Sequence, residues 1–112
     1  MSTPRFNHGS CIVRNNLYVV AGVSANGDAY ISNIEFLYLL DRGFGWIVLT
    51  VPTALDPHPL HRESPVVCQI SDYEFAIMGG MSRFARGLSS AVSIMNVIDN
   101  YTADLSRVIE ED

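Results

Sequence analysis

Short apolar stretches alternate with polar, turn-forming stretches along the whole chain. The apolar stretches are rich in β-branched and aromatic residues, which is typical of β-strands. Between them lie glycine, asparagine, aspartate and proline, the residues that make turns. We expect strands at 9–13, 17–22, 33–40, 46–51, 65–70, 74–80 and 91–98. The pattern therefore predicts an all-β chain of antiparallel strands joined mostly by short turns.

The second half of the chain repeats the first. LYVVAG at 17–22 is answered by FAIMGG at 75–80. The matched positions, 57 residues apart before the first turn and 58 after it, are Arg5 with Arg62, Cys11 with Cys68, Ala21 with Gly79 and Gly22 with Gly80. One residue inserted at a turn is a change that loops tolerate. A repeat of this length containing several strands is typical of propeller blades.

An arginine opens each unit (Arg5, Arg62), the second strand ends in a small-residue and glycine pair, and Trp46 lies in the fourth strand. On these residues the chain resembles the Kelch-repeat family. The resemblance implies two four-stranded antiparallel blades, a partial β-propeller: residues 1–52 as the first blade, 53–61 as an inter-blade loop, and 62–112 as the second blade with an acidic C-terminal end. Trp46 is expected to wedge between neighbouring blades.

The fourth strand of the second unit has no clear sequence signal. Leu105, Val108 and Ile109 are spaced as in a short amphipathic helix, whereas alternation around Arg107 fits an outer strand. We predict a degenerate strand, with Glu110 to Asp112 as a frayed end.

Two blades cannot close a propeller, which typically needs four to eight. Each blade buries its faces against its neighbours, so two blades leave two apolar faces bare. We therefore expect a chain that belongs to a larger propeller, self-associates to complete one, or packs into an assembly.

The antiparallel order sorts the loops between the two ends of the blades. The loops 23–32, 52–63 and 81–90 share one end, and the short turns 14–16, 41–45 and 71–74 lie at the other. Long loops on a rigid scaffold usually carry recognition, and the Kelch resemblance implies protein partners at such a face. The expected partner-binding residues are Arg83, Phe84, Arg86, His58, His61 and Arg62; solvated side chains are the alternative for the two loop arginines.

Charge and composition exclude several classes of partner. Seven basic residues, all arginine, stand against twelve acidic ones, giving a net charge of −5. Such a surface repels nucleic acid and anionic membranes, so neither is an expected partner. No leader and no apolar segment of membrane-spanning length is visible, which favours the cytoplasm or an organelle interior.

Catalytic and metal-binding patterns are weak in this sequence. His58 and His61 form an H-x-x-H beside Asp56, but a third ligand is missing nearby, and solvated histidines are the favoured interpretation. Cys11 and Cys68 lie in apolar stretches and are expected to be buried and reduced. We expect no cofactor and no metal, and no enzyme activity from this chain.

The sequence thus predicts a protein-interaction or scaffold module built from Kelch-like repeats. Two alternatives stay open: a fragment of a propeller enzyme whose catalytic residues lie on other blades, and a structural subunit whose bare blade faces are the functional interface.

Overall fold

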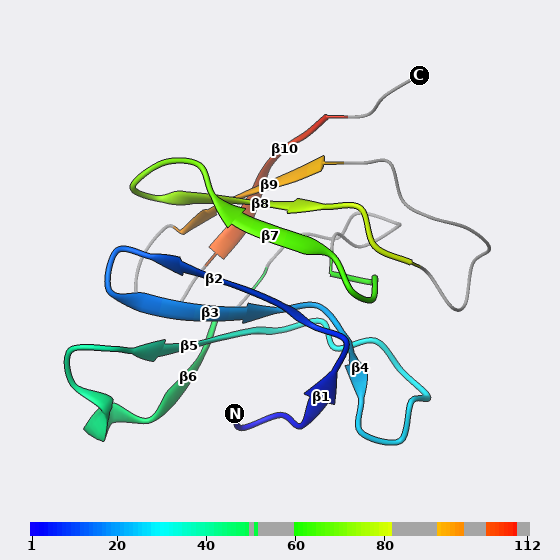
Figure 1. Cartoon of the computed structure of the whole chain (residues 1–112), viewed down its shortest axis with the longest axis horizontal. Helices are drawn as coiled ribbons and strands as arrows, with labels where there is room; N and C mark the ends of the chain where they lie inside the picture. Colours follow the sequence, from blue (N-terminus) through cyan, green and yellow to red (C-terminus); the bar gives the residue numbers. More distant parts are fainter. Residues whose placement is uncertain (50, 52–59, 82–91, 98–102, 110–112) are drawn as a thin grey trace.

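The computed structural model describes residues 1–49, 51, 60–81, 92–97 and 103–109 (Figure 1). Across these residues the regular structure is β-strand, apart from the short 3-10 turn η1 (Arg42–Phe44). The strands are β1 (Arg5–Phe6), β2 (Gly9–Val13), β3 (Asn16–Val20), β4 (Val23–Ser24), β5 (Ile34–Tyr38), β6 (Trp46–Leu49), β7 (Val66–Gln69), β8 (Glu74–Met78), β9 (Val92–Val97) and β10 (Ala103–Ile109). The all-β prediction is confirmed.

Two four-stranded antiparallel sheets make up most of this structure. The first sheet has the order β2-β3-β5-β6 and the second β7-β8-β9-β10, so each strand pairs with its neighbours along the chain apart from the short β4. The first sheet falls within residues 1–52 and the second within 62–112. In Figure 1 the second sheet lies above the first, with β2 and β7 side by side.

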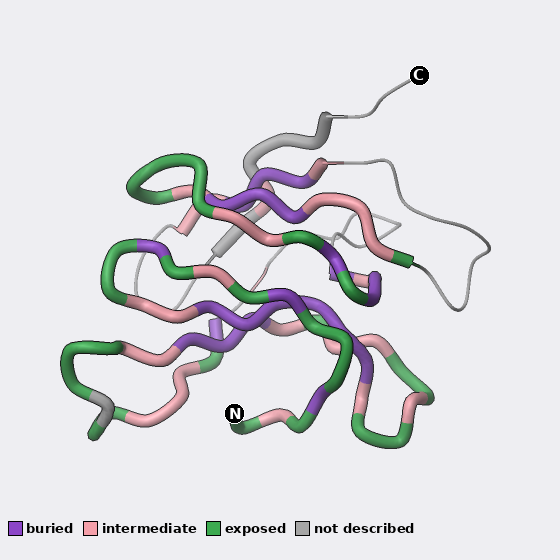
Figure 2. Tube along the Cα trace, in the orientation of Figure 1, coloured by how far each residue is buried: buried purple, intermediate pink, exposed green. Residues whose placement is uncertain are grey.

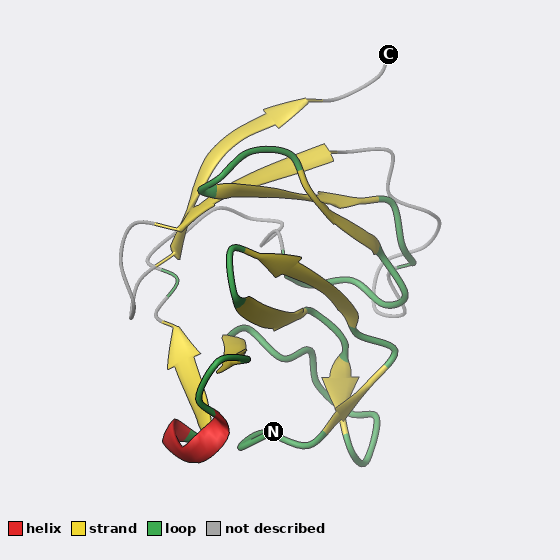
Figure 3. Ribbon diagram, turned by 60° about the vertical axis from the view of Figure 1, so that its left-hand side comes forward, coloured by secondary structure: helices red, strands yellow, loops and turns green. Residues whose placement is uncertain are grey.

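The two sheets bury an apolar core between them. Tyr18 of β3 stacks on Phe75 of β8, with ring centroids 5.6 Å apart, and also contacts Phe36 of β5 at 5.5 Å. The buried members of the core are Val13, Tyr18, Val20, Ile34, Phe36, Leu49, Leu60, Phe75, Ile77 and Met95. Buried residues follow the central strands of both sheets (Figure 2), and the turned view of Figure 3 shows the sheets as two layers. Each sheet therefore depends on the other to cover one of its faces.

The glycine pairs adopt the same backbone conformation in both units. Ala21 and Gly79 have φ of 61° and 65°, and the glycines that follow, Gly22 and Gly80, have φ of 90° and 92°. A Cβ on Gly22 would lie 2.7 Å from the carbonyl oxygen of Phe6, and one on Gly80 would lie 2.7 Å from that of Glu63. Close backbone approach combined with a positive φ therefore explains why glycine occupies the second position of the pair in both units.

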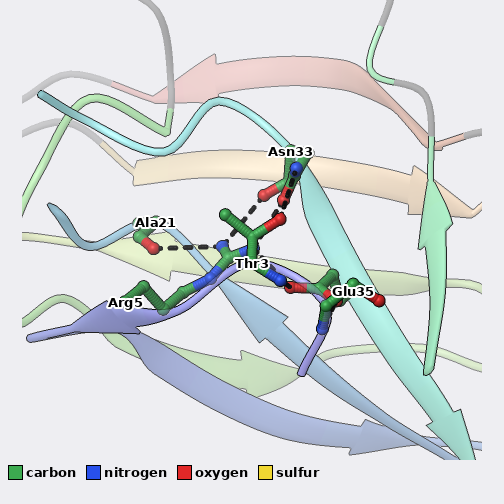
Figure 4. A network of polar contacts seen from close by, with 6 residues as sticks. Thr3, Arg5, Ala21, Asn33 and Glu35 are labelled. Atoms are coloured by element: carbon green, nitrogen blue, oxygen red, sulfur yellow. Dashed lines mark hydrogen bonds and ion pairs between the residues drawn. The ribbon is translucent and has the colours of Figure 1, made fainter. Parts of the chain in front are cut away.

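The guanidinium groups of Arg5 and Arg62 make hydrogen bonds at equivalent positions in the two units. The Arg5 Nη1 donates to the carbonyl of Ala21 at 3.3 Å, and its Nη2 donates to Glu35 at 2.9 Å (Figure 4). In the second unit the Arg62 Nη1 donates to the carbonyl of Gly79 at 3.1 Å and its Nη2 donates to the hydroxyl of Ser93 at 3.0 Å. Each arginine thus ties the segment before its sheet to the end of the second strand and to the third strand.

One pairing lies outside the predicted strands. β1 pairs with β4, placing Phe6 opposite Val23, and the isolated bridge between Glu63 and Met81 occupies the equivalent place in the second unit. Two-residue strands without an apolar alternation leave no recognisable trace in a sequence.

The C-terminal segment forms a strand, so the prediction for it is confirmed and the helical alternative is wrong. β10 pairs with β9 along its length, with a register shift between Leu105 and Arg107. Such an irregularity breaks the two-residue alternation of a strand, which is why the strand is hard to recognise in the sequence.

Candidate partner-binding end

The described parts of the loops predicted to share one end of the sheets lie together. The amide of Gly22 donates to the carbonyl of Arg62 at 3.0 Å, and the amide of Ser64 donates to that of Asn7 at 2.7 Å. Glu63 and Met81 exchange backbone hydrogen bonds of 2.8 and 2.9 Å. We call the described parts of this region, residues 22–32, 60–64 and Met81, the loop end.

An aromatic stack joins the two units at the loop end. The rings of Tyr30 and His61 lie nearly parallel, with an interplanar angle of 9° and centroids 5.2 Å apart. The Nε2 of His61 lies 2.8 Å from the Oγ of Ser32. Both residues are partly exposed, so part of this aromatic stack is accessible to a partner.

A compact polar turn lies beside this stack. The Ser24 hydroxyl lies 2.7 Å from Asn26 Oδ1 and 3.0 Å from Asp28 Oδ1, and the Asn26 side-chain amide donates to Asp28 at 3.1 Å. Gly27 allows the turn through its φ of 77°. The turn therefore presents exposed hydrogen-bonding groups in a fixed arrangement.

A buried ion pair lies next to the loop end, where Arg5 also donates to the carbonyls of Ala21 and Asn33. Arg5 and Glu35 are 2.9 Å apart and both side chains are fully buried. Burial acts to raise the pKa of Glu35, but hydrogen bonds from the backbone amides of Ser2 and Thr3 and from Arg5 outweigh it and hold the pKa below its ordinary value. Glu35 is therefore ionised at neutral pH and anchors the N-terminal segment.

In the described part of the chain, the opposite end of the sheets carries the predicted turns between β2 and β3, β5 and β6, and β7 and β8. The Arg14 guanidinium lies 4.8 Å from the centroid of the Tyr73 ring, which links the β2–β3 turn to the β7–β8 turn. The amide of Leu39 donates to the carbonyl of Asn15 at 2.8 Å. This turn end offers a matched surface for control substitutions.

The structure locates two of the six expected partner-binding residues. His61 lies at the loop end, in the stack with Tyr30. Arg62 is 6% exposed, and its guanidinium donates to the carbonyl of Gly79 and to the hydroxyl of Ser93 within the chain. His58, Arg83, Phe84 and Arg86 lie outside the described residues. Sequence reasoning missed Tyr30, whose only signal was its place after the Ala21-Gly22 pair.

The described part of the chain holds no group of three His, Cys, Asp or Glu side chains able to bind a metal. The pair His58 and His61 is not covered by this finding, because His58 is outside the described residues. Likewise, no helix among the residues that the structure describes is long and apolar enough to cross a membrane.

Cys11 is half-buried on β2 and carries a free thiol. Burial, with a further contribution from Cys68, raises the pKa of Cys11 from its ordinary value of 9.0 to about 12. Because only the thiolate reacts, we expect alkylation at pH 8 to be roughly a thousandfold slower than in the unfolded chain. Timed iodoacetamide labelling with mass spectrometry tests this prediction. A labelling rate in the folded chain close to that in the denatured chain would show that the Cys11 thiol is reactive.

Comparison of the chain with protein-family models and with curated proteins found no match. The site has to be interpreted from its own geometry.

Proposed function

We propose that this chain is a pair of Kelch-like propeller blades that works as a protein-interaction or scaffold module within a larger propeller or assembly. One observation carries the proposal: the two units repeat the same arginine, glycine-pair and bridge contacts, and their first strands β2 and β7 pack side by side. A fold built by stacking equivalent four-stranded sheets in one direction is a propeller or an open array, and both use rigid ends to display loops.

The loop end is the proposed partner-binding surface. It combines the Tyr30 and His61 stack with the polar turn at Ser24 to Asp28, and it is held by backbone hydrogen bonds between the two units. Arg83, Phe84 and Arg86 lie outside the described residues, and they are included in the proposal because the sequence predicts them to bind a partner. Aromatic and arginine side chains on a rigid scaffold are common anchors of protein interfaces.

Substitutions at the loop end test this proposal. We expect the Tyr30→Ala, His61→Ala double variant and the Arg83→Ala, Arg86→Ala double variant to lose a protein that the wild-type chain captures reproducibly in cross-linking mass spectrometry. The arginine variant should keep a melting temperature close to the wild-type value. The Tyr30→Ala, His61→Ala variant should lose about 1 kcal/mol of stability with the stack and remain folded.

Tyr73→Ala is the matched control, because Tyr73 is an exposed aromatic residue at the turn end. It should leave capture unchanged. Equal loss in the control, or no captured protein for the wild type, would contradict a recognition role for the loop end.

A further inference from the structure

The two sheets contact each other through different faces. On adjacent strands, directly paired residues project to the same face. The face of the first sheet that contacts the second sheet carries Cys11, Tyr18 and Phe36, which are paired across β2, β3 and β5. The contacting face of the second sheet carries Phe75, Met95 and Leu105, which are paired across β8, β9 and β10.

In the first sheet, the described residues leave the row equivalent to that buried one partly exposed, although its neighbours on the same face, Val19 and Glu35, are buried. Its residues are paired across all four strands in the order Ile12, Leu17, Leu37 and Trp46. Phe75 and Met95, the equivalents of Leu17 and Leu37, are 0% exposed, whereas Leu17 and Leu37 are only partly buried and Ile12 is 52% exposed. This row is therefore a partly exposed apolar surface, whereas the equivalent row of the second sheet is buried between the two sheets.

The second sheet has the complementary outer face, which is exposed at its β7 edge. Cys68, Ala76 and Ile94 are paired across β7, β8 and β9 at the positions that match Cys11, Tyr18 and Phe36. Ala76 and Ile94 are already buried at 2% and 3% exposed, whereas Cys68 is only partly buried. At the β7 edge Val66 is 62% exposed, although its equivalent Gly9 is buried between the sheets. One chain therefore carries both halves of a second contact, one along β2 on the outer face of the first sheet and one along β7 on the outer face of the second.

Large and small side chains on β2 and β7 are arranged so that they can pack together at this second interface. Within the chain β2 and β7 approach so closely that a Cβ on Gly9 would overlap the Val67 side chain and lie 3.2 Å from the carbonyl oxygen of Pro65. At the free faces the large residue is Val66 in place of Gly9, and the small residue is Ser10 in place of Val67. A small residue thus again opposes a large one, with the sizes reversed.

We propose that a second copy of this chain covers these faces, with the outer face of the second sheet of one copy packed on the outer face of the first sheet of the next. This inference rests on the proposed function, and it identifies further copies of the same chain as the source of the remaining blades. By analogy with the bond from Gly22 to Arg62, the amide of Gly80 donates to the carbonyl of Arg5 of the next copy. The contact joins unlike faces, so it repeats from copy to copy, and a closed ring of two to four copies has the four to eight blades of a propeller.

Light scattering on the full-length protein, coupled to size-exclusion chromatography, tests the proposal. The wild type should have two, three or four times the 12.4 kDa mass of one chain. Ile12→Arg and Val66→Arg each place a charge on one outer face and should weaken association by about a hundredfold, because a buried unpaired charge opposes binding. Leu40→Arg is the matched control, since Leu40 is 68% exposed in the turn after β5, and should keep the wild-type mass.

Mixing the two monomeric variants distinguishes unlike-face contact from a symmetric one. Each variant keeps the face that the other has lost, so an equimolar mixture should form a one-to-one complex that grows no further. Two variants that remain monomeric when mixed would contradict the head-to-tail geometry.

The wild-type mass separates this inference from the proposed function. A wild-type monomer that still captures a partner through Tyr30 and His61 would overturn self-association and leave the interaction module standing. A captured protein released by Ile12→Arg or Val66→Arg, with the chain itself monomeric, would show that another protein covers these faces. An oligomer that loses its partner equally in the loop-end and turn-end variants would contradict the proposed function alone.

Discussion

Glu35→Gln is expected to lower the free energy of unfolding by about 3 kcal/mol, because it leaves the buried guanidinium of Arg5 without its counter-charge. The amides of Ser2 and Thr3 also lose a charged acceptor. Urea denaturation followed by circular dichroism measures the loss, at one fixed protein concentration because association would contribute to stability. A change below about 1 kcal/mol, the range of solvated pairs, would show that the pair is effectively exposed.

Replacing both partners with apolar residues is the control. Arg5→Met combined with Glu35→Leu leaves no uncompensated charge, so this double variant should be more stable than Glu35→Gln. A double variant that is less stable than the single one would indicate that the hydrogen bonds of Arg5 to Ala21 and Asn33 matter more than the ion pair.

The same pair predicts how stability depends on pH. The pKa of Glu35 is lower in the folded state than its ordinary value of 4.5, so its contribution is complete above that pH and is lost as the pH falls through the folded-state value. Wild-type stability should therefore decrease below about pH 4.5, and Glu35→Gln should show a shallower decrease over that range. Parallel acid titrations of both proteins, with urea unfolding at each pH, provide the comparison.

Gly22→Ala and Gly80→Ala should each cost about 3 kcal/mol of the free energy of unfolding. Both glycines combine a left-handed φ with a carbonyl oxygen 2.7 Å from where a Cβ would lie, so the substitution adds backbone strain to steric overlap. Thermal and urea unfolding of the two variants would measure the cost.

Gly45→Ala separates the two contributions. Gly45 has a φ of 67°, but no atom lies within 4 Å of the point that a Cβ would occupy, so alanine there should cost only about 1 kcal/mol. Equal losses at Gly22 and Gly45 would show that φ alone, rather than the Phe6 carbonyl, makes glycine necessary in the pair.

The strands could be predicted from the sequence because each central strand presents apolar residues to a buried face. The offset that aligns Arg5 with Arg62 corresponds to a repeated contact in the structure, because both arginines donate to the carbonyl that follows the second strand. The division into long loops at one end and short turns at the other followed from antiparallel order alone. These features depend on local periodicity and on strand parity, which a sequence displays directly.

The candidate site was harder to predict because it depends on contacts between distant segments. The stacking of Tyr30 on His61 joins loops of different units, and neither residue has an unusual local context. Arg62 was expected to bind a partner, but it is only 6% exposed and its guanidinium donates within the chain. Its equivalence to Arg5 was visible in the sequence, but the burial of both was not.

The two members of the glycine pair carry unequal demands. The first position tolerates a methyl group, as Ala21 shows at a φ of 61°, whereas the second meets a backbone oxygen that cannot move aside. A search profile for such units should accordingly fix one glycine and let its predecessor vary among small residues. Degenerate blades that are overlooked by a double-glycine pattern would then become detectable in other genomes.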